Sequence, residues 1–342
     1  MKKIFVLPVI FVLLLGFSLE ARVPKGGLAD AAVTPDGKTI VVGGDSRVLY
    51  VLDASSLTVK KRIWFKSNIY EMEFNKDGSV LVVEDTSESL YFLDSRDWQV
   101  LKTIPKAGLM SAAPSADIVA GVGSGYKKST VKFFSMSDGT QKGQVEFPAK
   151  VTAVGLDAAG KRLLLLANGP KNKEAKNKTP KELKGLDRDI FRQKNDGKVS
   201  ILAEFEVPSG KKISEKTIFY STSSPVILVD KKMTYILGYS NVNAKIAGGK
   251  ITLFKSKSSY NYGMGVSPDR KAMLVGGLRS GTLINAANLD MVAFKVDKLP
   301  GWPEYYKGFG FAADGTGYAV TTAYRLVKID KKGVIEKTVP IY

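Results

Sequence analysis

"LADAAVTPDGKTIVVGGDSRVLYVLDASSLTVKKRIW" (residues 28–64) and "NIYEMEFNKDGSVLVVEDTSESLYFLDSRDWQVLKTIP" (residues 68–105) are two copies of one pattern. Each copy holds four short runs rich in β-branched and aromatic residues, separated by turn residues such as Pro35-Asp36-Gly37. Runs of this kind predict β-strands. Four strands repeated about every 40 residues are typical of the blades of a β-propeller.

Two markers give the number of blades. The turn after the first strand recurs at Pro35-Asp36-Gly37, Lys76-Asp77-Gly78, Pro114 to Asp117, Ala159-Gly160, Asp230-Lys231-Lys232, Pro268-Asp269-Arg270 and Ala313-Asp314-Gly315. The third strand recurs as "LYVLD", "LYFLD", "VKFFS", "VSILAEF", "ITLFK", "GTLIN" and "RLVKID". Both markers predict an all-β fold, a seven-bladed β-propeller of four-stranded blades. The turn aspartates at 36, 77, 269 and 314 are expected to accept hydrogen bonds from their own backbone.

These units resemble the YVTN-type and WD-repeat-like propellers of bacterial envelopes. The matching residues are "TPDGKTIVV" with "YVLDASSLTV", then "NKDGSVLVV" with "YFLDSRDWQV", and later "SPDRKAMLV" and "AADGTGYAV". The resemblance covers nearly all of residues 27–342, although the Trp-Asp dipeptide of WD repeats is absent. It implies an architecture and leaves the function open, because one fold hosts many functions.

The N-terminus predicts export. Lys2 and Lys3 precede an apolar run from Ile4 to Leu15, which is short for a membrane span and suits a signal peptide over residues 1–21. The alternative is an uncleaved anchor. Residues 22–342 then form one propeller domain, periplasmic or secreted, and the absence of cysteine means that packing alone stabilises it.

A basic insertion interrupts blade four. Residues 168–198 separate its second and third strands, and residues 170–198 carry 10 basic and 5 acidic side chains. Thr179-Pro180-Lys181-Glu182 has the form of a capping box, and Leu183, Leu186 and Ile190 recur at helical spacing. A short helix is therefore expected, which either docks on a partner or folds its apolar stripe back onto blade four. The candidate residues for electrostatic capture are Lys171, Lys173, Lys176, Lys178, Lys181 and Lys184.

Aromatic residues gather in two crossings between blades, on the same face as the insertion. "SSYNYG" (258–263) leads into blade six and "LPGWPEYYKGFGF" (299–311) into blade seven. Aromatic rings with polar tips suit a sugar, peptide or small-molecule site, and they equally suit wedges between blades. The candidate contact residues are Tyr260, Tyr262, Trp302, Tyr305 and Tyr306.

The formal charge of +18 favours an anionic partner such as phospholipid, acidic glycan or an acidic protein, although solubility alone is another reason for such a charge. Nucleic acid is not expected for an exported chain. Zero histidine and zero cysteine exclude a Ser-His-Asp triad, histidine-ligated zinc and axial histidine to haem. We therefore predict a non-catalytic binding or scaffolding module with no catalytic residue, metal or cofactor.

The alternative is a propeller enzyme of the lactone-hydrolase or quinoprotein-dehydrogenase type. Glu71, Glu73 and Glu304 are the acidic residues that could reach the central channel. A group of three or more carboxylates at one end of the channel would favour this alternative, whereas aromatic and lysine residues there would favour binding.

Overall fold

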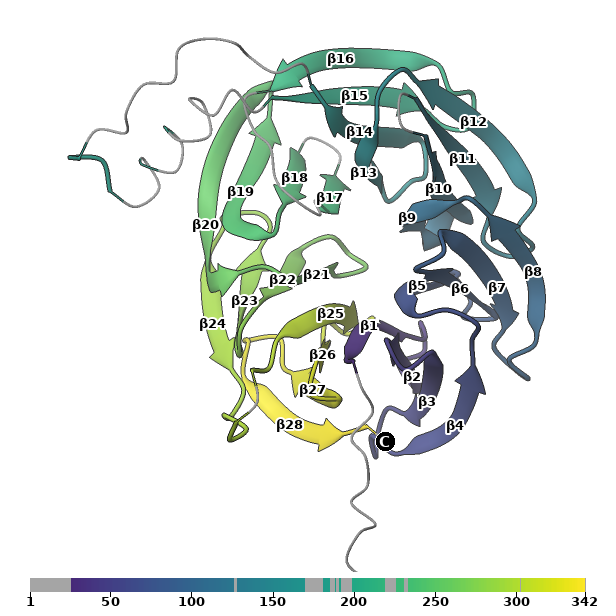
Figure 1. Cartoon of the computed structure of the whole chain (residues 1–342), viewed down its shortest axis with the longest axis vertical. Helices are drawn as coiled ribbons and strands as arrows, with labels where there is room; N and C mark the ends of the chain where they lie inside the picture. Colours follow the sequence, from purple (N-terminus) through teal and green to yellow (C-terminus); the bar gives the residue numbers. More distant parts are fainter. Residues whose placement is uncertain are drawn as a thin grey trace, which may run out of the picture.

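The computed structural model of this chain describes residues 26–125, 128–169, 181–184, 188, 191, 199–218, 226–230, 233–301 and 303–341. Its strands form seven four-stranded antiparallel sheets, each built from four strands consecutive in sequence. Figure 1 shows the sheets arranged as blades around one axis. The prediction of a seven-bladed β-propeller is thus confirmed.

The strands of each blade run outward from the axis in chain order. The first, innermost strands are β1 (Leu28–Val33), β5 (Ile69–Phe74), β9 (Gly108–Ala113), β13 (Val151–Leu156), β17 (Val226–Asp230), β21 (Gly263–Val266) and β25 (Tyr306–Phe311). The second are β2 (Thr39–Gly44), β6 (Val80–Asp85), β10 (Ile118–Ser124), β14 (Arg162–Asn168), β18 (Met233–Leu237), β22 (Ala272–Gly276) and β26 (Gly317–Thr321).

The third strands are β3 (Val48–Asp53), β7 (Ser89–Asp94), β11 (Ser129–Ser135), β15 (Ser200–Glu206), β19 (Ser240–Ala247), β23 (Ser280–Asn285) and β27 (Arg325–Ile329). The outermost are β4 (Val59–Trp64), β8 (Val100–Pro105), β12 (Gln141–Phe147), β16 (Lys212–Ile218), β20 (Lys250–Tyr260), β24 (Met291–Lys295) and β28 (Ile335–Pro340). A short 3-10 helix, η1 (Pro114–Ala116), follows β9.

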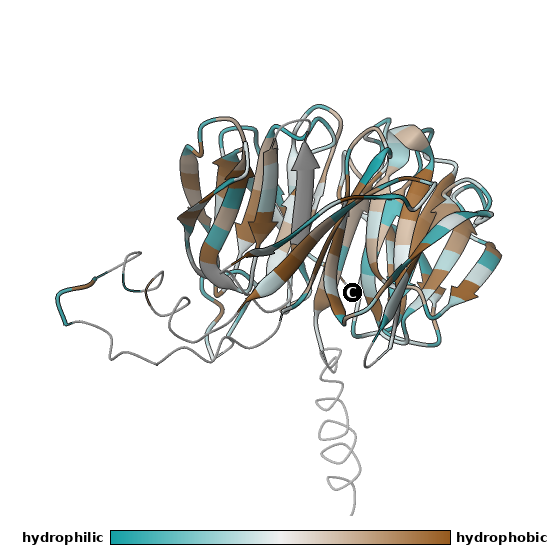
Figure 2. Cartoon of the chain, turned by 90° about the horizontal axis from the view of Figure 1, so that it is seen from above, coloured by the Kyte–Doolittle hydropathy of each residue, from teal (hydrophilic) through white to brown (hydrophobic). Residues whose placement is uncertain are grey.

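The hydrophobic core lies between neighbouring blades. Ala32 and Val41 of blade 1, for example, pack with Met72 and Leu81 of blade 2. Figure 2 shows the apolar bands within the blades and the hydrophilic loops at both ends. Because each blade is covered on both faces, its second strand reads as a nearly continuous apolar run, as in "TIVVGG" of β2.

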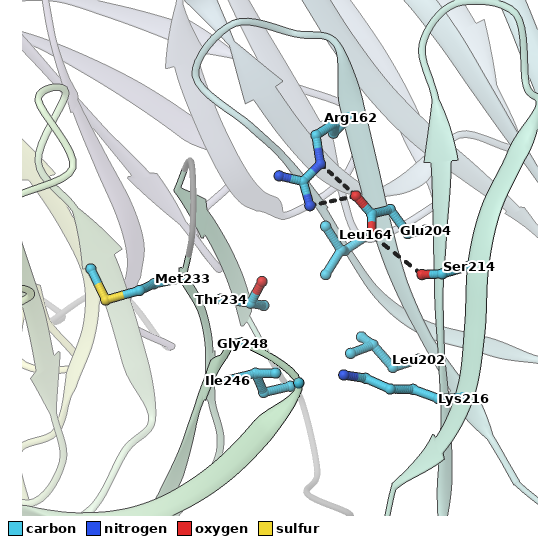
Figure 3. A pocket seen from close by; sticks show the side chains of 11 residues that line it. Arg162, Leu164, Leu202, Glu204, Ser214, Lys216, Met233, Thr234, Ile246 and Gly248 are labelled. Atoms are coloured by element: carbon cyan, nitrogen blue, oxygen red, sulfur yellow. Dashed lines mark hydrogen bonds and ion pairs between the residues drawn. The ribbon is translucent and has the colours of Figure 1, made fainter.

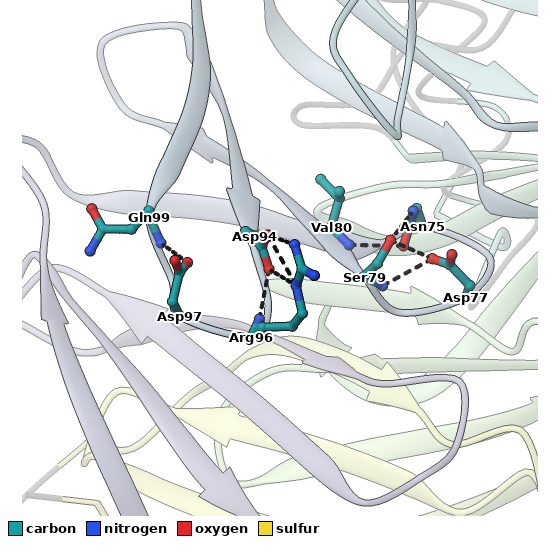
Figure 4. A network of polar contacts seen from close by, with 8 residues as sticks. All are labelled: Asn75, Asp77, Ser79, Val80, Asp94, Arg96, Asp97 and Gln99. Atoms are coloured by element: carbon teal, nitrogen blue, oxygen red, sulfur yellow. Dashed lines mark hydrogen bonds and ion pairs between the residues drawn. The ribbon is translucent and has the colours of Figure 1, made fainter.

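The turn aspartates bond their own backbone, as predicted. The Asp77 carboxylate accepts hydrogen bonds from the backbone N–H and the hydroxyl of Ser79, at 3.0 and 2.6 Å (Figure 4). The carboxylates of Asp36, Asp269 and Asp314 likewise accept the N–H two residues further on, at 3.0, 3.1 and 2.9 Å. These residues are therefore turn formers.

Two expectations need correction. "ITLFK" (251–255) lies in β20, the fourth strand of blade 5, and the third strand is the more polar "SNVNAKIA" of β19. The short helix in the insertion is not supported as an element: most of residues 168–198 lie outside the described residues, and only the isolated positions Arg188 and Phe191 have helical conformation there. Strand β19 was not recognised in the sequence because it is polar, and strands are recognised by alternating apolar residues.

The ring closes without a shared strand. Blade 1 and blade 7 each have four strands of their own, and β1 lies beside β25 (Figure 1). Leu28, Val42 and Tyr50 of blade 1 pack with Val320 and Leu326 of blade 7 in one cluster. Hydrophobic packing between complete blades therefore closes the propeller.

Candidate functional site

A central channel of about 1160 Å³ runs between the inner strands. The innermost strands of six blades, β1, β5, β9, β13, β21 and β25, contribute to its lining. Loops at the crossing face, the face that carries the blade-to-blade crossings and the loops between second and third strands, also contribute Tyr239 and Tyr262. A cavity of this size exceeds the range of about 300–1000 Å³ usual for small-molecule pockets.

Bulges surround the channel mouth at the crossing face. The pairing of β1, β5, β13 and β25 with their second strands skips one residue near the start of each inner strand. A bulge redirects the side chain of the extra residue and is common beside binding sites. The skipped residues, all of which line the channel, are Ala29, Tyr70, Thr152 and Lys307.

Four tyrosines form a cluster at the same mouth. The ring centroid of Tyr239 lies 5.7 Å from that of Tyr260 and 4.7 Å from that of Tyr262, and Tyr262 lies 4.8 Å from Tyr305. The Tyr239 hydroxyl donates a hydrogen bond to the Tyr262 hydroxyl at 2.7 Å. Tyr260 is 51% exposed. This tyrosine cluster thus joins two partly buried residues of the channel lining, Tyr239 and Tyr262, to the exposed Tyr260.

A buried polar network holds the tyrosine cluster in place. The Asn261 side-chain amide donates to the carbonyl of Gly238 at 3.0 Å, and its oxygen accepts from the hydroxyls of Ser256 and Ser258 at 2.9 and 2.7 Å. The Asn261 backbone N–H donates to the Tyr239 carbonyl at 2.9 Å. Because Asn261 is 1% exposed, these bonds are shielded from water and fix the loops on either side.

Gly277 allows the loop between β22 and β23 to approach Tyr260 of the tyrosine cluster closely. A Cβ on Gly277 would lie 2.0 Å from the Tyr260 carbonyl oxygen, so no other residue fits there without movement of the backbone. The Gly277 carbonyl in turn accepts the backbone N–H of Tyr306 at 3.0 Å. The crossings into blades 6 and 7 are thereby held together.

The charge beside the tyrosine cluster is positive. The Lys307 ammonium lies 5.4 Å from the centroid of the Tyr262 ring, a cation–π contact. The pKa of Tyr262 is raised to about 12, first by its hydrogen bond with Tyr239 and then by burial. The phenol therefore stays neutral and keeps its hydroxyl proton near neutral pH.

Carboxylates of blades 1 and 2 also line the channel. Burial raises the pKa of Asp30 and of Glu71 well above their ordinary values, and nearby acidic groups add to both effects. Burial also raises the pKa of Glu73 to about 7, although Arg270 opposes that change. The Asp30 carboxylate accepts the Met72 backbone N–H at 2.7 Å and so ties blade 1 to blade 2.

Glu84 has a structural role. Its carboxylate oxygens accept the backbone N–H groups of Leu109 and Met110, at 2.9 and 2.6 Å, and so join blade 2 to blade 3. Burial raises its pKa to about 7. In the part of the chain that the structure describes, no group of three acidic side chains lies close enough to hold a metal ion.

The structure brings together three of the predicted aromatic residues, Tyr260, Tyr262 and Tyr305. Tyr306 is different: it is completely buried, packs between Phe294 and Phe309 and cannot meet a partner at the surface. Tyr306 therefore fills the contact between blades 6 and 7, which was the second role considered for the aromatic residues of the crossings. Trp302 lies outside the described residues.

The predicted lysines are only partly described. Lys181 and Lys184 are exposed, whereas Lys171, Lys173, Lys176 and Lys178 lie outside the described residues. The segment predicted to be a signal peptide, residues 1–21, also lies outside them. Among the residues that the structure describes, no helix is long and apolar enough to cross a membrane.

Sequence reasoning missed Tyr70, Tyr239 and Lys307. Tyr239 lies between the second and third strands of blade 5, on the variable face, and assigning β19 correctly would have revealed it. The bulges that direct Tyr70 and Lys307 toward the mouth have no signal in the sequence. Glu304, considered as a channel carboxylate, is completely buried and paired with Arg325.

A second, smaller cavity of about 190 Å³ lies between blades 4 and 5 (Figure 3). Arg162 and Glu204 form an ion pair on its wall, and the Ser214 hydroxyl donates to Glu204 at 3.3 Å. The Glu204 carboxylate is thus already paired with Arg162 and Ser214 within the protein. The central channel, with its open tyrosine cluster, remains the better candidate site.

Fold and site together define a seven-bladed β-propeller with an aromatic mouth to its central channel. No protein-family model and no curated protein matches the sequence. Among solved structures, the chain is similar to Kuenenia stuttgartiensis hydrazine synthase, with a TM-score of 0.63 and 15% identity over 89% of this chain and 94% of that chain. At this identity the likeness shows the fold alone, because this fold serves many functions.

Proposed function

We propose that this chain is an exported, non-catalytic β-propeller that binds a partner at the crossing face. One observation carries the proposal: the tyrosine cluster extends from the channel lining, at Tyr239 and Tyr262, to Tyr260, which is 51% exposed. Tyrosine combines a large apolar ring with a polar hydroxyl and loses little conformational entropy on binding. Such a surface is favourable for recognition.

The sequence supports the remaining parts of this proposal. Export rests on the N-terminus, where Lys2 and Lys3 precede the apolar run from Ile4 to Leu15. An anionic partner, an acidic protein or glycan at the cell envelope, rests on the charge of +18. The lysines of the insertion, residues 171 to 184, would attract that partner over longer distances, since exposed charges act mainly on association rates.

The test is capture of partners from an envelope extract by the purified protein, with elution by a salt gradient. Tyr260→Ala with Tyr305→Ala should abolish recovery of a discrete partner, whereas deletion of residues 170–196 should lower the salt concentration at which it elutes. Trp64→Ala is the matched control, because Trp64 is 78% exposed on the outer strand β4. Equal recovery by the tyrosine variant and the wild type would contradict the proposal.

A second candidate, a hydrolytic enzyme, is favoured by one observation. Asp30, Glu71 and Glu73 lie on one side of the channel, and the pKa of Glu73 is raised to about 7, which suits a general acid or base. Turnover of lactones or esters that is lost in Glu73→Gln and kept in Tyr260→Ala would support this candidate. If none of a panel of such substrates is turned over, the hydrolytic candidate is wrong and the binding function stands.

A further inference from the structure

The two faces of the propeller differ in charge. Basic residues outnumber acidic ones in the described loops of the crossing face, whereas turn aspartates balance the cations in the described loops of the opposite face. Cations of the opposite face also pair with neighbouring aspartates, as Lys271 does with Asp269 at 3.5 Å and Arg96 with Asp94 at 2.6 Å. Of the two faces, the crossing face is therefore the basic one.

A basic rim surrounds the channel mouth on the crossing face. Its members are exposed and form no ion pair with any residue that the structure describes. They are Arg47 in blade 1, Lys66, Lys106 and Lys150 in the crossings into blades 2, 3 and 4, and Lys298 in the crossing into blade 7. The same loops also hold the exposed acidic residues Asp45, Glu88 and Asp297. Because the rim extends over several blades, a planar anionic surface can meet all of it at once, whereas a single chain would meet only part of it.

Exposed aromatic residues lie at the same end of the blades. Trp64 is the last residue of β4 and Tyr260 is the last residue of β20, and both strands run toward the crossing face. At the opposite end, exposed large apolar residues such as Val292 and Val334 are aliphatic. Tryptophan and tyrosine are favoured at membrane–water interfaces, because each has an apolar ring and a polar group. The crossing face thus combines unpaired cations with interfacial aromatic residues.

The chain enters the fold on this face. The Gly27 backbone N–H donates to the Asp45 carboxylate at 3.0 Å, and Asp45 precedes Arg47 of the basic rim by two residues. Residues 1–21 are the segment predicted to insert into a membrane during export. Residues 22–25 can span at most about 14 Å, so insertion of that segment brings the crossing face close to the lipid.

We propose that the crossing face lies on an anionic phospholipid bilayer, with the basic rim against the lipid phosphates and Trp64 among the headgroups. This inference goes beyond the proposed function, because the lipid is a second ligand in addition to the partner of the tyrosine cluster. One exposed cation near an anionic membrane gives only a modest attraction that salt weakens, so several are needed. The basic rim supplies them, and the lipid concentrates the protein where an envelope partner lies.

Vesicle sedimentation tests the lipid. All seven blades are complete without residues 1–25, so the protein used is residues 22–342, which lacks the apolar N-terminus. We expect binding to vesicles of equal parts phosphatidylcholine and phosphatidylglycerol, falling as salt is added, and much weaker binding to phosphatidylcholine alone. No binding to the mixed vesicles, or equal binding to both kinds, would overturn the inference.

Neutral variants of the two faces separate local charge from net charge. The rim variant is Arg47→Gln, Lys66→Gln, Lys106→Gln and Lys150→Gln. Its binding to the mixed vesicles should fall by about a hundredfold or more, since each cation near the surface contributes about fivefold. The control removes the same charge from exposed lysines of the opposite face: Lys161→Gln, Lys211→Gln, Lys331→Gln and Lys332→Gln. The control should bind nearly as well as the wild type, and equal losses in both variants would contradict binding through the crossing face.

Quenching by lipids that carry bromine on their acyl chains tests the orientation. With Trp98→Phe and Trp302→Phe, only Trp64 remains, and its fluorescence should be quenched on mixed vesicles. With Trp64→Phe and Trp302→Phe, only Trp98 remains, in the turn between β7 and β8 on the opposite face, and it should not be quenched. Quenching of Trp98 without quenching of Trp64 would place the opposite face on the bilayer and overturn the inference.

The two proposals fail separately. Tyr260→Ala with Tyr305→Ala should lose the protein partner and keep binding to vesicles, whereas the rim variant should lose the vesicles. If the tyrosine variant captures its partner normally while the wild type binds mixed vesicles, the proposed function is wrong and the lipid inference stands. If the wild type binds no vesicles and the rim variant loses a protein partner, the rim recognises an acidic protein and the lipid inference is wrong.

Discussion

Glu304 and Arg325 form a buried ion pair that joins the crossing before blade 7 to the third strand of that blade. Glu304 is completely buried, and the Arg325 guanidinium donates from Nε to its carboxylate at 2.8 Å. Arg325 also donates to the Asp297 carbonyl at 2.9 Å. An ion pair in this position is costly to break, because the remaining charge has no access to water.

Arg325→Met should therefore destabilise the protein strongly. Removal of one partner of a buried pair typically costs about 3–5 kcal/mol, because the other charge stays buried without compensation. Urea unfolding followed by circular dichroism measures the loss. The double variant Arg325→Met with Glu304→Met should be less destabilised than the single variant; if it is equally or more destabilised, the isolated charge is not the cause.

Glu73 should make stability depend on pH. Its pKa is about 7 in the folded protein and 4.5 in its ordinary state, so the folded protein holds a proton that the unfolded chain releases between these values. The contribution of Glu73 to stability is therefore fully present below pH 4.5 and is lost as the pH rises toward 7, by about 1.4 kcal/mol per pH unit for one proton. Asp30, Glu71 and Glu84 act in the same direction.

Glu73→Gln should accordingly reduce the slope of unfolding free energy against pH between 4.5 and 7, without removing it entirely. Urea unfolding at several pH values measures this slope. Glu206→Gln, at the end of β15, is the control and should leave the slope unchanged. An unaltered slope in Glu73→Gln would mean that Glu73 is ionised throughout this range.

At the scale of the elements, strands differ by their distance from the axis. The second strands are buried, whereas outer strands such as β4 expose most of their side chains. An outer strand has one unpaired edge, and lysine or arginine on such an edge prevents pairing with another chain. Lys60, Lys61 and Arg62 occupy the middle of β4, next to the exposed Trp64.

Replacing these three residues by threonine should promote self-association through β4. Threonine favours strands and carries no charge, so the edge next to Trp64 becomes an open template for pairing. Sedimentation velocity at increasing protein concentration measures the effect. Lys331→Thr with Lys332→Thr, in the turn between β27 and β28, is the control; equal association of both variants would point to net charge as the cause.

At the scale of the whole molecule, closure by packing makes the interface between blades 7 and 1 equivalent to the others. Leu326 is completely buried in the cluster that contains Leu28 and Val42. Leu165 is equally buried in the cluster between blades 3 and 4. Among the described strands none is exchanged between blades 7 and 1, since each of these blades is a four-stranded sheet of consecutive strands.

Leu326→Ala and Leu165→Ala should therefore cost similar amounts, about 2–5 kcal/mol each, since both leave a cavity in a buried cluster. Both variants should unfold in one transition, because each blade depends on its neighbours for its core. Calorimetry and urea unfolding measure these quantities. A separate early transition in Leu326→Ala alone would show that the ring opens at the closure before the blades unfold.

The sequence alone determined the architecture. A repeat of four strands, with turn aspartates such as Asp36 and Asp77, predicts seven blades because both signals are local and recur in every unit. The blade-to-blade crossings also identified Tyr260, Tyr262 and Tyr305 as neighbours on one face. The third strand of blade 5 was assigned wrongly, since the polar β19 lacks the apolar alternation of a typical strand.

Only the tertiary structure decided which side chains reach the channel mouth. Tyr305 and Tyr306 are adjacent in sequence, yet Tyr305, just before β25, joins the tyrosine cluster, whereas Tyr306, the first residue of β25, is completely buried between Phe294 and Phe309. The bulges that direct Tyr70 and Lys307 depend on pairing between strands. The tyrosine cluster itself arises only when packing between blades brings the loop of Tyr239 and the crossings of Tyr262 and Tyr305 together.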